Sequence, residues 1–181
     1  DCKKVSKVIV VPPPGVESLQ VTCIERFGDY VILAAGKWIY IFDGLSFQAL
    51  SYWQAHDSTI QGLAVLDGKI WSFCDASFQI KLWVLDVQGG SMVSLKQIPL
   101  QGLYSDSDLQ FIKRVEESVW CFYKDGHLAV IDTSLKQKFS SMWMEGNAEI
   151  TNVLCTEEQI IITTDSLLLG LAKDPTSDDV L

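Results

Sequence analysis

The chain has 181 residues, of which 48% are hydrophobic, so it can bury a substantial core but is too short for two large domains. Its formal net charge is −9, from 14 basic and 23 acidic residues. This charge disfavours nucleic acid and anionic membranes as partners, because both require a basic protein surface. Proteins that carry basic patches are compatible with it.

Five widely spaced cysteines occur without any CxxC pair: Cys2, Cys23, Cys74, Cys121 and Cys155. This pattern predicts free thiols and a cytoplasmic location rather than a disulfide framework. No run of about eighteen apolar residues is present, so we expect no membrane insertion. The start, DCKKVSKVIVVPPPG, lacks the pattern of a signal peptide and has no Met, which fits a piece of a longer protein.

Short apolar segments rich in Val, Ile, Trp, Tyr and Phe follow one another along the chain, each bounded by Gly, Asp, Asn or Ser. This is the signature of β-strands joined by tight turns, and no helical periodicity extends over about eleven residues. The predicted strands are 5–11, 20–27, 29–35, 37–42, 47–53, 59–66, 69–74, 78–85, 91–98, 108–115, 117–123, 127–132, 135–143, 149–154, 158–163 and 167–172. The sequence therefore predicts an all-β fold.

Two anchor positions recur along these strands. One lies in the second strand of each unit, at Ile32, Trp71, Trp120 and Ile161. The other lies in the third strand, at Phe42, Trp83, Ile131 and Leu171. The steps are 39, 49 and 41 residues for the first anchor and 41, 48 and 40 for the second, so both follow the same rhythm. A period of about forty residues with four strands per unit is typical of β-propeller blades.

The repeat predicts a single propeller domain or propeller segment with blades at 19–54, 55–100, 101–145 and 146–172. The fourth unit has only three predicted strands, and strand 5–11 is left over at the N-terminus. That strand could complete the fourth blade and close a four-bladed ring, which would remove the open sheet edge. Alternatively, the four blades belong to a larger ring that further sequence or a second copy completes.

The second unit carries a more specific pattern: His56 before its first strand, Ser72 in a buried strand, Asp75 in a turn and Trp83 at the third strand. The chain thereby resembles a divergent WD-repeat β-propeller. In that family such residues form a hydrogen-bonded tetrad that fixes one blade. The resemblance implies a structural tetrad of His56, Ser72 and Trp83 with either Asp75 or Ser77. It also favours the larger or paired ring, because WD-like units usually form rings of seven or eight blades.

The chain departs from the WD pattern at several positions. Ala55-His56 stands for the usual Gly-His, and Trp83-Val84 for Trp-Asp. The first and third units keep an apolar residue followed by Asp, at Phe42-Asp43 and Ile131-Asp132, but they lack the His. The fourth unit, with Leu171-Ala172, keeps neither.

Catalytic chemistry has little support. His56 fits the structural tetrad and His127 lies in a hairpin turn, and no base can be assigned to any Ser or Cys. Asp106 and Asp108 alone offer too few ligands for calcium. We expect no enzyme activity, no metal and no cofactor.

The sequence instead predicts a scaffold for protein–protein interaction, since irregular loops on a rigid fold are where binding residues gather. The resemblance implies a larger signalling or trafficking protein around it. The residues predicted to contact partners lie in or beside the connections: Trp38, Asp57, Tyr104, Asp106, Asp108, Lys124, Asp125 and Trp143. The alternative is an oligomerisation module that joins copies of the chain through incomplete propellers.

Overall fold

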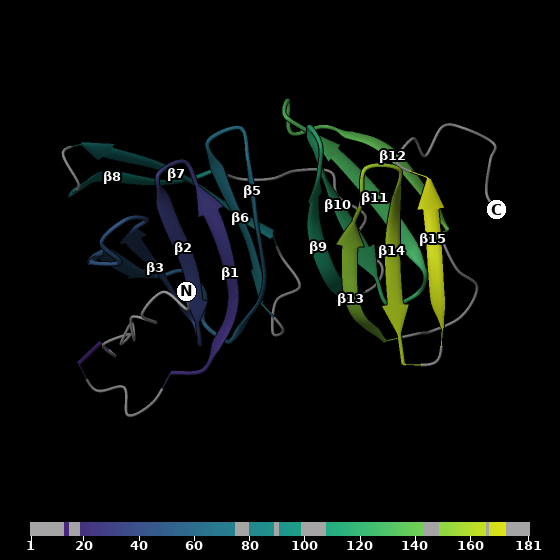
Figure 1. The fold of residues 1–181 in the computed structure, drawn as a ribbon, viewed down its shortest axis with the longest axis horizontal. Coiled ribbons are helices and arrows are strands. Elements are labelled where there is room, and N and C mark those ends of the chain that lie inside the picture. The colour runs from purple at the N-terminus through teal and green to yellow at the C-terminus, as the bar shows by residue number, and fades with distance from the viewer. Residues whose placement is uncertain are drawn as a thin grey trace, which may run out of the picture.

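The computed structural model describes residues 13–14, 19–74, 80–88, 91–98, 108–142, 149–165 and 167–172. Within these ranges the chain forms 15 strands and no helix, and the strands make four antiparallel sheets (Figure 1). In each sheet the strands lie in chain order, so every sheet is a simple meander. The predicted all-β fold is confirmed.

The first sheet consists of β1 (Val21–Phe27), β2 (Tyr30–Ala35), β3 (Trp38–Asp43) and β4 (Ala49–Gln54). The second consists of β5 (Ile60–Leu66), β6 (Lys69–Cys74), β7 (Ile80–Gln88) and β8 (Ser91–Ile98). The third consists of β9 (Leu109–Val115), β10 (Ser118–Tyr123), β11 (His127–Asp132) and β12 (Gln137–Met142). The fourth has three described strands, β13 (Ile150–Cys155), β14 (Gln159–Thr164) and β15 (Leu168–Ala172).

These strands reproduce fifteen of the sixteen predicted ones, with ends that differ by at most three residues. The predicted strand 5–11 lies outside the described residues. The boundaries are predictable because the turn residues have strong local preferences. At the β5–β6 turn, Asp67 and Gly68 have φ angles of 49° and 65°. Two positive φ angles in succession make the tight hairpin turn whose twist matches that of the flanking strands, and Asp-Gly is a favoured pair there.

A different turn joins the third and fourth strands of the first and third sheets. In the first sheet, Asp43 Oδ1 accepts hydrogen bonds from the backbone N–H groups of Leu45 (3.1 Å) and Ser46 (2.7 Å) and from the Ser46 hydroxyl. In the third, Asp132 accepts equivalent bonds from the Ser134 amide and hydroxyl. These bonds hold the pKa of both carboxyl groups below the usual range. The Asp that follows an apolar residue in these two units therefore caps a turn.

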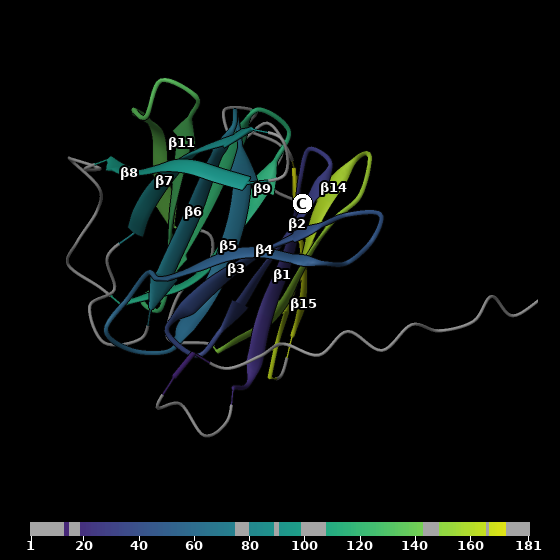
Figure 2. The ribbon, with the colours of Figure 1, turned by 90° about the vertical axis from the view of Figure 1, so that its left-hand side faces the viewer.

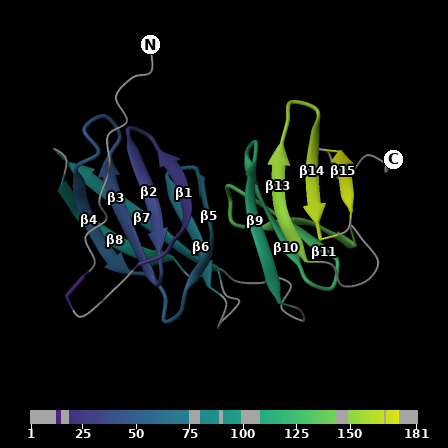
Figure 3. The same cartoon turned by 60° about the horizontal axis from the view of Figure 1, so that its bottom comes forward.

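Successive sheets pack face to face through their first strands, β1 against β5, β5 against β9, and β9 against β13. Figure 3 shows these first strands toward the middle of the molecule and β4, β8 and β15 toward the outside. Figure 2 views the stack from the side of the first two sheets, with β4 and β8 toward the viewer. Each inner sheet is therefore covered on both faces, which explains its continuous apolar strands.

Three hydrophobic cores fill the spaces between neighbouring sheets. Trp83 lies between the first and second sheets, Trp71 between the second and third, and Trp120 between the third and fourth. All three anchor tryptophans are buried. No core cluster of the described residues joins the fourth sheet to the first. The stack therefore has two outer faces, one on the first sheet and one on the fourth.

Candidate functional site

The two ends of the stack differ in construction. At one end, here called the connection end, the turns between the second and third strands of each sheet lie beside the segments that link successive sheets. The backbone N–H groups of Ala55 and His56 donate to the Lys37 carbonyl at 3.0 and 3.2 Å, and the Lys124 N–H donates to the Asp108 carbonyl at 2.9 Å. The other end, here called the turn end, carries the turns between the first and second strands and between the third and fourth strands of each sheet. Backbone hydrogen bonds thus anchor the irregular segments of the connection end to the sheets.

Four of the residues predicted to contact partners lie at this connection end. Asp57, Asp108 and Lys124 are exposed. Asp125 is half-buried, with its Oδ2 3.0 Å from His127 Nδ1. Three further predicted residues lie outside the described part of the chain: Tyr104, Asp106 and Trp143.

Trp38, also predicted to contact partners, begins β3 on the outer face of the first sheet, where it is half-buried. Its indole ring is the first of four aromatic rings in a row. Trp38 and Tyr52 meet edge to face at 5.8 Å between centroids, Tyr52 and Tyr40 lie 5.4 Å apart, and Tyr40 and Phe42 lie 6.3 Å apart. We call this row the aromatic ladder. The spacing of two residues in Trp38, Tyr40 and Phe42 places them on one face, a sequence signal that loop-centred reasoning missed.

Trp53 lies on the opposite face of the first sheet. Its side chain is 9% exposed, and its ring packs edge to face against Trp83 at 5.8 Å between centroids. It belongs to the core between the first and second sheets. Trp53 is therefore a core residue, because the second sheet covers this face.

Three of the four predicted tetrad residues meet inside the second sheet. Ser72 Oγ lies 2.8 Å from His56 Nε2 and accepts a hydrogen bond from Trp83 Nε1 at 2.9 Å. All three side chains are buried. The fourth, Asp75, lies outside the described residues, as does its alternative, Ser77. His56 Nδ1 is buried and has no hydrogen-bond partner among the described residues.

Burial, with Lys81 nearby, lowers the pKa of His56 to about 4. The imidazole is therefore neutral at pH 7. His56 is 1% exposed and its Nε2 lies against the Ser72 hydroxyl, so its chemistry is that of a structural hydrogen-bond partner. This geometry offers no general base.

The turn end has a hollow of about 610 Å³ that spans the first three sheets. Arg26 of β1 and Arg114 of β9 enter it beside Asp29 and Asp67. Nearby, burial raises the pKa of Glu25, and the charges of Lys113 and Arg114 oppose that shift. Charges of both signs meet here, so the hollow is not selective for an ion of either sign.

The described residues contain no group of three or more His, Cys, Asp or Glu side chains that could hold a metal ion. Among the described residues no disulfide joins the four cysteines, Cys23, Cys74, Cys121 and Cys155. Among the described residues there is also no helix that could cross a membrane.

No protein-family model and no curated protein sequence matches this chain. Solved structures do. The computationally designed Ika4 protein matches with a TM-score of 0.64 and 15% identity, over 93% of this chain and 99% of the design. Hsv2 of Kluyveromyces lactis matches with a TM-score of 0.62 and 12% identity, over 89% of this chain and 53% of Hsv2. The β-propeller domain of Cps50 (Swd1) from Myceliophteria thermophila matches with a TM-score of 0.62 and 14% identity, over 84% and 53%.

The chain has a β-propeller fold. Sequence identities this low support a conclusion about the fold alone. The chain spans about half the length of these two natural propellers but nearly all of Ika4. The four sheets therefore correspond to part of the natural rings.

Proposed function

We propose that this chain is a non-catalytic platform that binds other proteins through its connection end. The supporting observation is that exposed charged residues stand there on segments held by backbone hydrogen bonds to the neighbouring turns. Rigid support of this kind reduces the entropy lost on binding. The similarity to natural propellers supports protein partners in general. A larger cytoplasmic protein with a signalling or trafficking role is the setting we propose for it.

The charge at this end defines the partner chemistry. Asp57 and Asp108 are exposed carboxylates, and the chain as a whole carries a net charge of −9. A partner with a basic patch would be attracted by the long-range field and oriented by the local carboxylates. Lys124 supplies the one opposite charge among the three exposed predicted contacts.

Charge reversal tests this proposal. The double variant Asp57→Lys with Asp108→Lys should lose bound proteins in quantitative affinity capture, compared with the unchanged chain. The matched control is Glu157→Lys with Glu158→Lys, because these exposed carboxylates lie on the β13–β14 turn at the opposite end. Partners retained by the control and lost by the connection-end variant support the platform. Equal capture by all three chains refutes it.

A second candidate function is joining copies of the chain, which the outer face of the fourth sheet favours. Leu154 is 57% exposed and Leu168 is 73% exposed on this sheet. Ile161 is the equivalent of Trp120, which packs against the next sheet in the stack, so Ile161 lies on the outer face. Light scattering at micromolar concentration tests this function: the unchanged chain should be larger than a monomer, and Leu168→Lys should reduce its mass. A strict monomer removes this candidate.

A further inference from the structure

The central strands of the first sheet, β2 and β3, have buried side chains on the outer face of this sheet. Tyr40 is 2% exposed, Phe42 3% and Leu33 9%. Among the described strands, none outside the first sheet packs against this cluster, and the described residue that reaches it from the N-terminal side is Leu19. The outer face of the fourth sheet, where Leu168 is 73% exposed, shows what an uncovered terminal face looks like in the same molecule.

The aromatic ladder on this face holds two hydrogen-bond donors without acceptors. Trp38 Nε1 and the Tyr40 hydroxyl are both buried, and neither has a partner among the described residues. Burial, followed by the neighbouring Tyr52, raises the pKa of Tyr40, so its hydroxyl remains protonated and able to donate. Buried donors in native proteins nearly always have an acceptor. A segment that fits this face therefore supplies hydrogen-bond acceptors and apolar rings.

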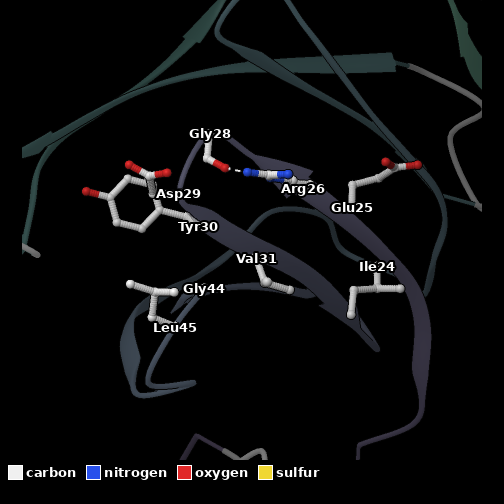
Figure 4. Close-up of a pocket in the computed structure, with 9 residues that line it drawn as sticks. All are labelled: Ile24, Glu25, Arg26, Gly28, Asp29, Tyr30, Val31, Gly44 and Leu45. Atoms are coloured by element: carbon white, nitrogen blue, oxygen red, sulfur yellow. Dashed lines mark hydrogen bonds between the residues drawn. The ribbon is translucent and has the colours of Figure 1, made fainter.

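A hollow of about 540 Å³ adjoins the ladder through Val31, and the side chains that line it, the charged Glu25, Arg26 and Asp29 among them, are drawn in Figure 4. Val31, the strand partner of Phe42, lines it together with Ile24 and Leu45. Ile24 is 64% exposed and Leu45 is 93% exposed. Arg26, at the rim, is held by a 2.9 Å hydrogen bond from its Nε to the Gly28 carbonyl. The ladder and the apolar side chains of the hollow form one strip along the sheet, and the hollow has a volume in the range of ligand sites.

We propose that residues 11–15 of the same chain, VPPPG, bind along this strip as a polyproline helix. Proline carries a carbonyl acceptor but no N–H, so three prolines in succession present only acceptors to the two unpaired donors. Proline rings also pack on aromatic faces, and the fixed φ angle leaves little entropy to lose. Pro13 is buried whereas Pro14 is exposed, as expected when one side of a polyproline helix is docked.

The length of the connecting chain allows this arrangement. Leu19 packs on the same cluster and follows Pro13 by six residues. Six extended residues reach about 20 Å, which is the length of a strand such as β3. The segment can therefore reach any part of the strip from its attachment at Leu19. Docked there, it shields the face that a preceding sheet or a second copy would otherwise contact.

Photo-cross-linking of the full chain tests the identity of the occupant. Tyr52, 45% exposed on the edge strand β4, is replaced by photoreactive p-benzoylphenylalanine, and a mixture of light and heavy isotope-labelled chains separates contacts within a chain from contacts between chains. We expect cross-links within one chain to residues 8–15. Cross-links between chains to residues 150–172 would overturn the proposal in favour of a second copy. The absence of any cross-link beyond the first sheet would also overturn it.

Two further chains complete the test. The photoreactive residue at Leu154, on the fourth sheet, should give no cross-link to residues 8–15. Serine at all three positions Pro12, Pro13 and Pro14, with the photoreactive group at Tyr52, should lower the cross-link yield by about fivefold or more, because both ring packing and preorganisation are lost. An unchanged yield refutes polyproline recognition. Leu45 serves as the photoreactive position if the Tyr52 variant does not fold.

Discussion

Replacing Ser72 with alanine removes one hydroxyl that serves two buried partners. Ser72 Oγ lies 2.8 Å from His56 Nε2 and 2.9 Å from Trp83 Nε1. Ser72 is 0% exposed, His56 1% and Trp83 6%, so water cannot replace the lost group without entering the core. The substitution therefore leaves an imidazole nitrogen and an indole N–H without partners.

Each buried polar group left unsatisfied costs about 1–3 kcal/mol. For two such groups we expect Ser72→Ala to lower the free energy of unfolding by about 2–6 kcal/mol. The alanine side chain itself adds little, because it leaves only the volume of one oxygen atom. The measurement is equilibrium unfolding in urea, followed by tryptophan fluorescence and far-UV circular dichroism.

Ser118→Ala is the matched control. Ser118 is half-buried, accepts a 3.2 Å hydrogen bond from Trp120 Nε1 and donates to the Val115 carbonyl at 2.9 Å. Solvent can reach this site, so the loss should be about 1 kcal/mol or less. A loss below about 0.5 kcal/mol for Ser72→Ala would refute the reasoning, because it would mean that the buried His56 and Trp83 do not need the Ser72 hydroxyl.

Three further predictions concern the interior on the two faces of the second sheet. His56 has a pKa of about 4 in the folded chain and its ordinary pKa of 6.5 in the unfolded chain, so a falling pH protonates the unfolded chain first. The free energy of unfolding should therefore fall by up to about 3 kcal/mol between pH 6.5 and pH 4. Urea titrations at several pH values should show that His56→Gln flattens this dependence. Gly62→Ala would place a Cβ against the Phe73 ring and 3.1 Å from Ile112 Cγ1, so thermal unfolding should show a loss of about 1–3 kcal/mol. If Asp75 accepts a hydrogen bond from His56 Nδ1, Asp75→Ala should lower the free energy of unfolding by about 1–2 kcal/mol. The same loss from Asp75→Ala in the His56→Gln variant as in the unchanged chain would contradict that contact.

The strands and their grouping are predictable because their signals are local. Turn pairs such as Asp67-Gly68 have conformational preferences that do not depend on the rest of the fold. The anchors Trp71 and Trp120 recur with the blade period because each fills the same place between two sheets. Repetition turns a three-dimensional packing requirement into a pattern along the chain, which is why the sequence alone predicts a propeller.

The roles of individual faces are less predictable, because they depend on what packs against them. Trp53 and Tyr52 are neighbours in β4, yet one is buried against the second sheet and the other is exposed on the ladder. Alternation places them on opposite faces, but nothing local states which face another sheet covers. Asp43 shows the same limit: its position after Phe42 resembles a family motif, whereas its hydrogen bonds make it a turn cap.

The two outer faces determine how copies of this chain could assemble. Trp120 of the third sheet faces the fourth sheet, and the equivalent residue of the fourth sheet, Ile161, lies on the outer face of that sheet. Trp83 of the second sheet faces the first sheet, and the equivalent residue of the first sheet, Phe42, lies on the outer face of that sheet. Continuing the stack from copy to copy would bring these two different faces together, a heterologous contact that either closes into a ring or propagates. Phe42 is only 3% exposed, so this contact must first uncover its face, whereas Leu168, at 73%, is already open. A symmetric contact between two fourth sheets would need no such uncovering, so if copies of the chain associate, we expect closed pairs rather than growing chains.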